Sequence, residues 1–177
     1  MPKWTHVILH HSFTGDQDLP DVVGIRRFHT SYRQRGHIIS EETYLEKKDN
    51  NEDGLVRPWK DIGYHWVVER LSDGRPWAIQ GRSMMMFGAH CPDQGMNRRG
   101  IGVCVIGNYD AEPPPEDIFE HAADFVGWLC RMYRIPVENV QGHRDQMDYK
   151  SCPGDEFDLE YFRERVSEYL DRWKPNI

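Results

Sequence analysis

The segment GIGVCVIGNY, residues 100–109, restricts the possible fold more than any other part of the sequence. Most of its residues are apolar at successive positions, so a strand formed here carries apolar side chains on both faces. Such a strand needs a layer of protein on each side to keep water away from it. The segment therefore predicts a central strand in a sheet that is covered on both faces.

Three other regions have the composition of strands. Residues 5–12, THVILHHS, form a short apolar run that ends in polar residues, as expected of a buried strand whose carboxyl end meets a site. Residues 62–81 contain β-branched and aromatic residues on either side of a Ser-Asp-Gly turn at 72–74, which predicts two strands. Residues 137–142, VENVQG, are a candidate for one more short strand.

Helices are predicted where apolar residues recur at the spacing of one helical face. Residues 21–36 have Asp21 as a candidate N-cap and Gly36 as a candidate stop, and residues 116–134 follow a proline-rich approach. Asp158 is a candidate N-cap for a last helix. The residues expected to face inward on this last helix are Leu159, Phe162, Val166, Leu170 and Trp173.

This order of elements predicts an α/β fold with a central mixed β-sheet flanked by helices. At 177 residues the chain is long enough for one sizeable core, so residues 1–177 are expected to form a single domain. Residues 37–60 are charge-rich with weak periodicity, and turn-forming clusters such as Asp53-Gly54 interrupt them. We interpret residues 37–60 as a surface insertion.

The charge pattern bears on the classes of partner. The chain has 29 acidic and 22 basic residues, a net charge of −7, and its basic pairs are scattered along the sequence. This argues against a nucleic-acid partner. The start lacks the basic and apolar regions of a secretory signal, and no run of about 20 apolar residues occurs. We expect no membrane insertion and no export by that route.

The four cysteines show neither a CxxC pair nor the density of a disulfide scaffold, so reduced thiols are expected. Cys104 lies in the predicted central strand and Cys130 in a predicted helix, where both are interpreted as small core residues. Cys152 differs, because Pro-Gly follows it and no periodicity surrounds it. It belongs on a loop.

The loop QGHRDQMDYKSCPG, residues 141–154, sets His143 and Cys152 nine positions apart. The cysteine could be a reactive thiol, half of a disulfide, or a metal ligand. Catalytic zinc is held by three protein ligands such as imidazole and thiolate, with the fourth position left for water. A third ligand would have to come from another histidine, and His10 and His11 end a predicted strand. The spacing alone leaves open an unrelated loop cysteine and a surface histidine.

Several motifs in order along the chain resemble one known family. They are VILHHS, IRRFHTSYRQRG, DIGYHWVVERLSDG, GRSMMMFGAH, GIGVCVIGNY and GHRD…KSCPG. Together they resemble the zinc-dependent N-acetylmuramoyl-L-alanine amidases, which include short phage amidases and the animal peptidoglycan recognition proteins. The resemblance covers nearly the whole chain apart from residues 38–60, and it implies a peptidoglycan recognition protein-like amidase fold.

The resemblance implies a Zn2+ site with His10, His143 and Cys152 as ligands. His143 and Cys152 lie one position further apart than is usual in the family, so the loop between them holds an extra residue. Because neighbouring side chains on a strand point to opposite faces, His10 and His11 cannot both reach one metal without distorting the backbone. The family position selects His10, which leaves His11 a packing or hydrogen-bonding role.

The resemblance also implies the remaining site residues. Tyr64 and Lys150 fall on positions that serve catalysis in the phage amidases, whereas animal members usually carry threonine at the lysine position. His90 matches a histidine that lines the substrate groove, and Asn97 follows where the groove wall continues. A structural histidine with its hydrogen bonds satisfied within the protein is the alternative interpretation of His90.

The implied activity is hydrolysis of the amide bond between the lactyl group of N-acetylmuramic acid and L-alanine in peptidoglycan. A monomeric phage or prophage endolysin is expected, cytoplasmic on synthesis and acting in the periplasm or cell wall after release. One alternative is a non-catalytic peptidoglycan recognition module, although such members commonly replace the cysteine that is present here as Cys152. The other is a cytosolic muropeptide-recycling amidase, although those enzymes usually carry aspartate as the third ligand.

Overall fold

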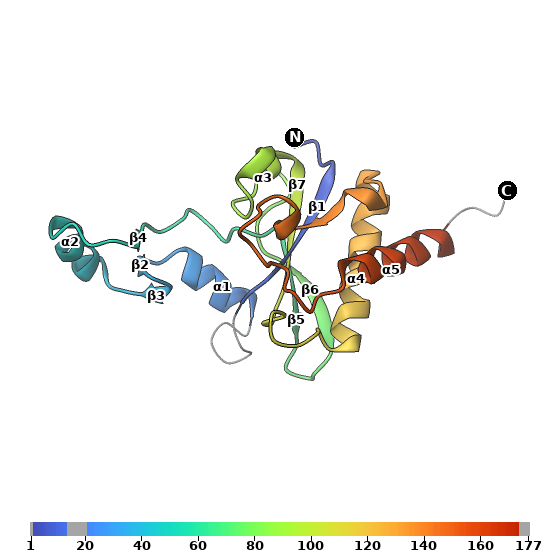
Figure 1. Ribbon diagram of the computed structural model, residues 1–177, viewed down its shortest axis with the longest axis horizontal. Helices are drawn as coiled ribbons and strands as arrows, with labels where there is room; N and C mark the ends of the chain where they lie inside the picture. The colour runs from blue at the N-terminus through green and yellow to red at the C-terminus, as the bar shows by residue number, and fades with distance from the viewer. Residues whose placement is uncertain (1, 14–20, 174–177) are drawn as a thin grey trace.

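The computed structural model describes residues 2–13 and 21–173. Its centre is a five-stranded sheet in the order β6-β5-β7-β1-β8 (Figure 1). The strands are β1 (His6–His11), β5 (Trp66–Arg70), β6 (Pro76–Gln80), β7 (Gly100–Val105) and β8 (Val140–Gly142). β7 pairs in parallel with β1 and β5, β1 pairs in parallel with β8, and β5 and β6 form an antiparallel hairpin. The predicted mixed sheet is confirmed, with β7 at its centre.

Helices lie on both faces of this sheet. The long helices α4 (Glu116–Tyr133) and α5 (Leu159–Arg172) cover one face, where they share a buried cluster with Val7 and Leu9 of β1 (Figure 1). On the other face α1 (Val22–His29) packs against β5 and β7. The short helix α3 (Met96–Arg99) leads directly into β7. No helix in the described part of the chain is long and apolar enough to cross a membrane.

Helix α5 begins where the sequence predicts. The Asp158 side chain accepts a hydrogen bond from the Tyr161 amide, and the inward residues Leu159, Phe162 and Val166 are buried. The prediction for Trp173 is wrong, because the helix ends at Arg172 and Trp173 is 54% exposed. Leu170 is the last residue of the helix that packs against the core, and Trp173 follows three residues later, beyond the end of the core.

Helix α1 is shorter than the predicted 21–36. It ends at His29, and the chain then turns into a hairpin of β2 (Arg33–Gln34) and β3 (His37–Ile38). Gly36 does not stop the helix; it forms the hairpin turn with Arg35, and both residues have positive φ, 86° and 48°. Two consecutive positive φ values give the tight turn whose twist matches a two-stranded ribbon.

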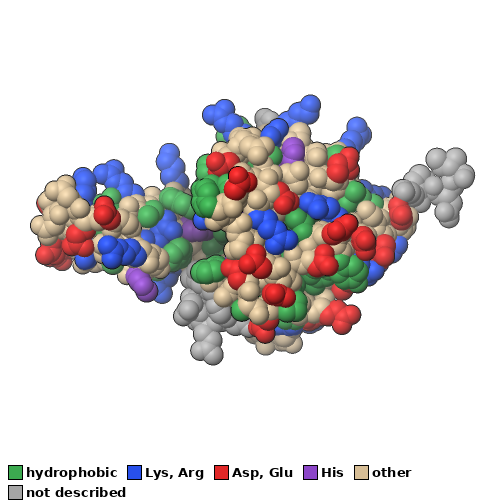
Figure 2. Space-filling model, in the orientation of Figure 1, with side chains coloured by type: hydrophobic (Ala, Val, Ile, Leu, Met, Phe, Trp, Pro, Cys, Tyr) green, Lys and Arg blue, Asp and Glu red, His purple; other side chains and the backbone are tan. Residues whose placement is uncertain are grey.

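The predicted surface insertion is an ordered structure. Strands β3, β2 and β4 (Leu55–Val56) form a second small sheet, and α2 (Glu41–Asp49) lies between β3 and β4 in sequence. We call residues 33–56 the arm, because they stand out from the body of the molecule (Figures 1 and 2). The Trp59 amide donates to the His29 carbonyl at 2.9 Å, which closes the arm at its root.

The spacing of apolar residues did not predict helix α2, because few of its side chains are apolar. It is stabilised by its ends instead. The Ser40 hydroxyl accepts from the Thr43 amide at 3.0 Å, with Glu41 and Glu42 in the first turn and Lys47 and Lys48 in the last. Acidic residues near the amino end and basic residues near the carboxyl end both interact favourably with the helix dipole.

Phe162 offers a test of the α4–α5 layer. Its side chain is fully buried and packs at 5.2 Å against the ring of Phe119 and at 5.3 Å against that of Phe157. Phe162→Ala should lower the free energy of unfolding by about 3–5 kcal/mol, because the substitution leaves a cavity. Chemical denaturation monitored by circular dichroism measures this loss. The exposed Glu160→Ala is the control, and a loss in Phe162→Ala no larger than in the control would contradict the assigned packing.

Candidate metal centre

Three potential metal ligands converge on the α1 side of the sheet. Donor atoms of His10, His143 and Cys152 all lie within 4.8 Å of one another. His10 is at the carboxyl end of β1, and His143 directly follows β8, which runs parallel to β1. Parallel strands bring their carboxyl ends to the same edge of a sheet, so the topology places both histidines together. The three residues that the resemblance implied as ligands are therefore neighbours in space.

The loop that carries Cys152 is tied back to the residue after His143. The Arg144 amide donates to the Cys152 carbonyl at 2.7 Å, and the Arg144 guanidinium donates to the carbonyls of Gly154 and Phe157. These bonds bring the two ligands together although nine positions separate them. Arg144 was not among the residues predicted to act at the site, although it directly follows a candidate ligand in the GHRD motif.

The sulfur of Cys152 faces both His10 and the end of β1. It accepts a hydrogen bond from the His11 amide at 3.4 Å and lies 3.6 Å from His10 Nδ1. Burial raises the pKa of the Cys152 thiol to about 12, although the His11 amide and the nearby Lys150 oppose the shift. Without a metal the sulfur is therefore a thiol, and a bound cation would favour the thiolate.

The separation of His10 Nδ1 from Cys152 Sγ fits zinc. Zinc bonds of about 2.0–2.1 Å to nitrogen and about 2.3 Å to sulfur, at tetrahedral angles, place the two donor atoms about 3.6 Å apart. The separation of His10 Nδ1 from Cys152 Sγ is 3.6 Å. Imidazole and thiolate are also the donors that zinc prefers. The described residues thus supply a donor set suited to zinc, with one pair of donor atoms at the separation that this ion requires.

Both histidines of the cluster are held in the neutral form that binds metals. Burial lowers the pKa of His10 well below its ordinary value, and the surrounding histidines lower it further. Burial and then the Lys150 ammonium lower the pKa of His143 to about 4. The Nε2 of His143 lies 3.0 Å from the Met147 sulfur, a contact that the sequence did not reveal. A proton on that nitrogen leaves Nδ1 free to bind a metal.

His11 has a different set of contacts. Its Nδ1 accepts a hydrogen bond from the Tyr109 amide at 3.2 Å, and its ring lies near Tyr109 and Phe13. Among the described residues, the cluster of potential ligands includes His10 and leaves out His11. The choice of His10 over His11 as a metal ligand stays a prediction.

A pocket of about 410 Å³ opens over the cluster, and Tyr64, His90 and Lys150 also line it. The Tyr64 ring lies 5.0 Å from the His10 ring. Burial raises the pKa of the Tyr64 phenol well above its ordinary value, so the hydroxyl keeps its proton and can donate it in a hydrogen bond. Lys150 is exposed, with Nζ 5.4 Å from the Tyr149 ring centre. The pocket thus joins the ligand cluster to a neutral donor, Tyr64, and an exposed cation, Lys150.

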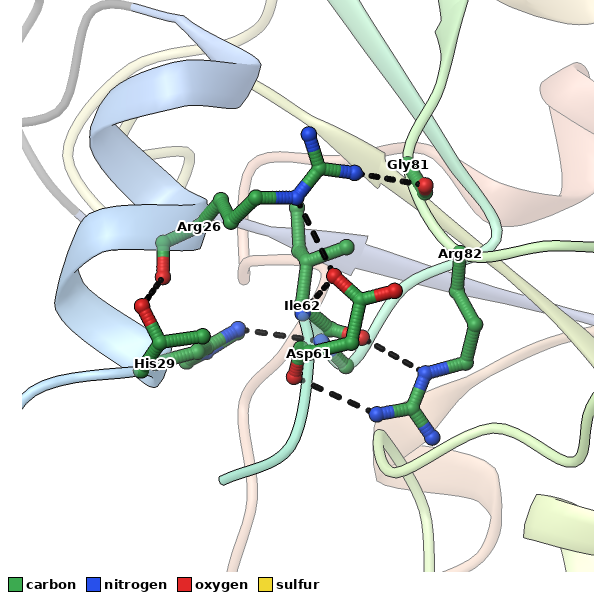
Figure 3. A network of polar contacts seen from close by, with 8 residues as sticks. Arg26, His29, Asp61, Ile62, Gly81 and Arg82 are labelled. Atoms are coloured by element: carbon green, nitrogen blue, oxygen red, sulfur yellow. Dashed lines mark hydrogen bonds and ion pairs between the residues drawn. The ribbon is translucent and has the colours of Figure 1, made fainter. Parts of the chain in front are cut away.

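The segment before Tyr64 is held by a polar network (Figure 3). The buried Arg82 donates to the carbonyl of Ile62 at 2.7 Å and to that of Asp61 at 3.2 Å. The Asp61 carboxylate in turn accepts from Arg26 of α1 at 3.1 Å. Because each group has a partner on another element, the backbone leading to Tyr64 has little freedom to move.

His90 lines the pocket next to His10, and Asn97 is hydrogen-bonded to its backbone. The side-chain oxygen of Asn97 accepts from the amides of His90 and Cys91, at 2.7 and 2.9 Å, which fixes the turn between them. His90 is 7% exposed, and its Nδ1 lies 3.1 Å from His10 Nε2. The substrate contacts implied for His90 and Asn97 stay predictions, whereas the structure shows that both already have partners within the protein.

A mixed sheet covered by helices, with two histidines and a cysteine grouped at the edge of a pocket, defines a class of α/β protein whose site could hold a metal ion. The sequence profile described as N-acetylmuramoyl-L-alanine amidase matches residues 1–155. The chain belongs to this family.

Relatives with similar sequences include an animal amidase and a phage endolysin. It is 41% identical over 104 residues to an N-acetylmuramoyl-L-alanine amidase of Sus scrofa, across 55% of this chain and 15% of that protein. It is 40% identical over 113 residues to an endolysin of Enterobacteria phage T3, across 60% of this chain and 67% of the endolysin. The chain therefore spans a small part of the pig relative and two thirds of the phage one.

Solved structures share the fold. Drosophila PGRP-LB in complex with tracheal cytotoxin superposes with a TM-score of 0.61 and 23% identity, over 90% of this chain and 80% of that one. The amidase LysC from Clostridium intestinale superposes with a TM-score of 0.58 and 19% identity, over 93% and 86%. The expected peptidoglycan recognition protein-like amidase fold is confirmed.

The two adjacent histidines can be separated by metal analysis. His10→Ala should lose bound zinc, because His10 Nδ1 faces the Cys152 sulfur, whereas His11→Ala should retain it, because the His11 ring contacts Tyr109 instead. Zinc content is measured on both folded variants after purification without chelators, with the natural chain as the reference. Zinc-free His11→Ala beside zinc-replete His10→Ala would reverse the assignment.

Proposed function

We propose that this protein is a zinc-dependent hydrolase that cleaves the amide bond between the lactyl group of N-acetylmuramic acid and L-alanine in peptidoglycan. One observation carries the proposal: the donor atoms of His10, His143 and Cys152 lie within 4.8 Å of one another, in a pocket that Tyr64 and Lys150 also line. Membership of the amidase family supports the same reaction. A pure recognition role would leave the convergence of three ligands without a use.

The carbonyl carbon of an amide is a poor electrophile, so its hydrolysis needs a group that activates it. When bound, zinc supplies Lewis acidity, which polarises a carbonyl group and lowers the pKa of water. Lys150 is exposed at the pocket, so its ammonium can approach the negative charge that develops on the carbonyl oxygen. Tyr64 keeps its proton, and its ring lies 5.0 Å from that of His10 at the pocket, so we assign its hydroxyl as a hydrogen-bond donor to the substrate in place of its contact with Cys104. The substrate would bind across the pocket opening, where both groups can reach the same amide.

We further propose that the protein acts as a phage or prophage endolysin on bacterial cell walls. The endolysins of phage T3 and Klebsiella phage KP32 are 40% and 39% identical to it over the matched residues. A lysine at position 150, where the resemblance implies threonine in most animal members, favours this role over animal immune recognition. The cysteine ligand favours it over muropeptide recycling.

Analysis of digested peptidoglycan tests the reaction. Incubation with the zinc-loaded protein should release peptides with free N-terminal L-alanine and leave the glycan chains intact, and a strong chelator should abolish this release. Mass spectrometry of the soluble products identifies both. Binding to the wall without any new amino terminus would indicate a recognition module, and activity that survives complete zinc removal would refute the metal-dependent reaction.

Lys150→Ala separates chemistry from metal binding. Removal of a group that stabilises the developing negative charge should lower turnover by about 10²–10³-fold, while zinc content and the unfolding midpoint stay unchanged. The exposed Lys3→Ala is the matched control for loss of one positive charge. Turnover of Lys150→Ala equal to that of the control would remove Lys150 from the mechanism.

Tyr64→Phe removes only a hydroxyl from the pocket. We expect a fall in turnover smaller than in Lys150→Ala, with no change in bound zinc, because the ring packing of Tyr64 against His10 and His29 is kept. Steady-state kinetics on a soluble muropeptide give turnover and KM separately. Natural turnover in Tyr64→Phe would show that the hydroxyl does not act on the reacting amide.

A further inference from the structure

His90 makes two contacts that together determine where protons sit in the metal centre. Its Nε2 lies 3.1 Å from the Gly100 carbonyl oxygen, and its Nδ1 lies 3.1 Å from His10 Nε2. Both rings are buried, and their planes meet almost at right angles. A chain of contacts therefore runs from a backbone carbonyl, through His90, to the ring of a potential zinc ligand.

Only one arrangement of protons satisfies this chain. A carbonyl oxygen can only accept, so His90 Nε2 must carry the proton that it donates to Gly100. In a neutral imidazole the other nitrogen, His90 Nδ1, then has a lone pair and accepts from His10 Nε2. His10 must carry its proton on Nε2, which leaves a lone pair on His10 Nδ1. That nitrogen is the one that lies 3.6 Å from the Cys152 sulfur.

The opposite arrangement is unfavourable. If His10 carried its proton on Nδ1, its Nε2 would need a donor from His90 Nδ1. The lone pair of His90 Nε2 would then face the lone pairs of the Gly100 oxygen across 3.1 Å. A buried carbonyl without a donor and two opposed lone pairs both cost free energy in a site of low dielectric constant.

The surrounding chain has room for the His90 ring and little else. A Cβ atom added at Gly88 would lie 2.4 Å from His90 Cδ2, and one added at Gly102 would lie 2.5 Å from the same atom. The His90 backbone amide donates a hydrogen bond to the side-chain oxygen of Asn97, which holds the His90 backbone in place. Two glycines and an asparagine therefore keep the ring in one position between strand β7 and His10.

We propose that His90 is a positioning residue. It fixes which ring nitrogen of neutral His10 carries the proton, so that His10 presents the lone pair of Nδ1 to zinc. The inference rests on the zinc site of the proposed function and deepens it. It goes beyond the substrate-contact role implied for His90, because the residue acts through a metal ligand. His90 thereby pre-organises the centre before the ion arrives.

The natural chain gives a direct test that needs no substitution. Long-range proton–nitrogen correlation spectra of the metal-free full chain at neutral pH distinguish the two neutral forms of each histidine. Both His10 and His90 should carry the proton on Nε2. A spectrum in which His10 carries it on Nδ1 would overturn the proposal, whatever the behaviour of any variant.

Variants test the consequence for metal affinity. His90→Phe keeps an aromatic ring of similar shape but removes both polar contacts, so zinc affinity should fall about 10–100-fold. His90→Gln offers a carboxamide oxygen to His10 and an amide N–H to Gly100, so it should restore a large part of the loss. His29→Phe is the matched control, because His29 is also buried and accepts a backbone hydrogen bond, from Gly63. Zinc affinity is measured by competition with a chelator of known affinity.

The outcomes separate this inference from the proposed function. Zinc affinity of a folded His90→Phe equal to that of His29→Phe would overturn the positioning role, even if the natural chain digests peptidoglycan. Conversely, the expected spectra and affinities in a chain that releases no N-terminal L-alanine would leave the positioning role intact and refute the amidase reaction. If His90→Phe does not fold, the spectra of the natural chain decide.

Discussion

Strand β1 carries the constraint on which the rest of the molecule depends, because it is hydrogen-bonded on both sides and covered on both faces. β7 and β8 flank it in parallel, and Val7 and Leu9 pack toward α4 and α5. A strand in this position allows no slip in register, since one step would exchange its two sets of side chains. The register therefore places His10 beside Cys104 and holds it there. The position of the metal centre follows from the packing of the core.

The buried polar groups around His10 are arranged as a set, each with a partner. Its ring meets those of Tyr64, His90 and His143 at 4.7–5.1 Å, in a region where burial keeps all three histidines neutral. A protein interior tolerates such groups when each donor finds an acceptor, and it strengthens the contacts that are made. The same environment favours a thiolate and a cation together over either alone. The cluster is thus stable as a set of neutral side chains, and its donor atoms lie close enough together that they could hold a metal ion.

Sequence patterns predicted those parts of the fold that depend on local composition. The central strand, the hairpin of β5 and β6, helix α4 and the cap at Asp158 all follow from periodicity and turn residues. Helix α2 was missed because its stability comes from Ser40 and from charges at its ends. The contact between His90 and His10 joins residues 80 positions apart, and no local pattern encodes it. The ligand set came from the resemblance, since His143 and Cys152 alone allowed several interpretations.

The closed root of the arm limits what a change in its length can cost the fold. Since the His29 carbonyl and the Trp59 amide meet at 2.9 Å, the chain leaves the body and returns to it at nearly one point. The entropic cost of closing a loop rises only slowly with its length, by about 0.6 kcal/mol for each doubling. A change in the length of residues 33–56 should accordingly alter the free energy of unfolding little, as long as Arg33 keeps its contacts with Phe28 and Trp59 of the body. The outer end of the arm is thereby mechanically separate from the strand that carries His10.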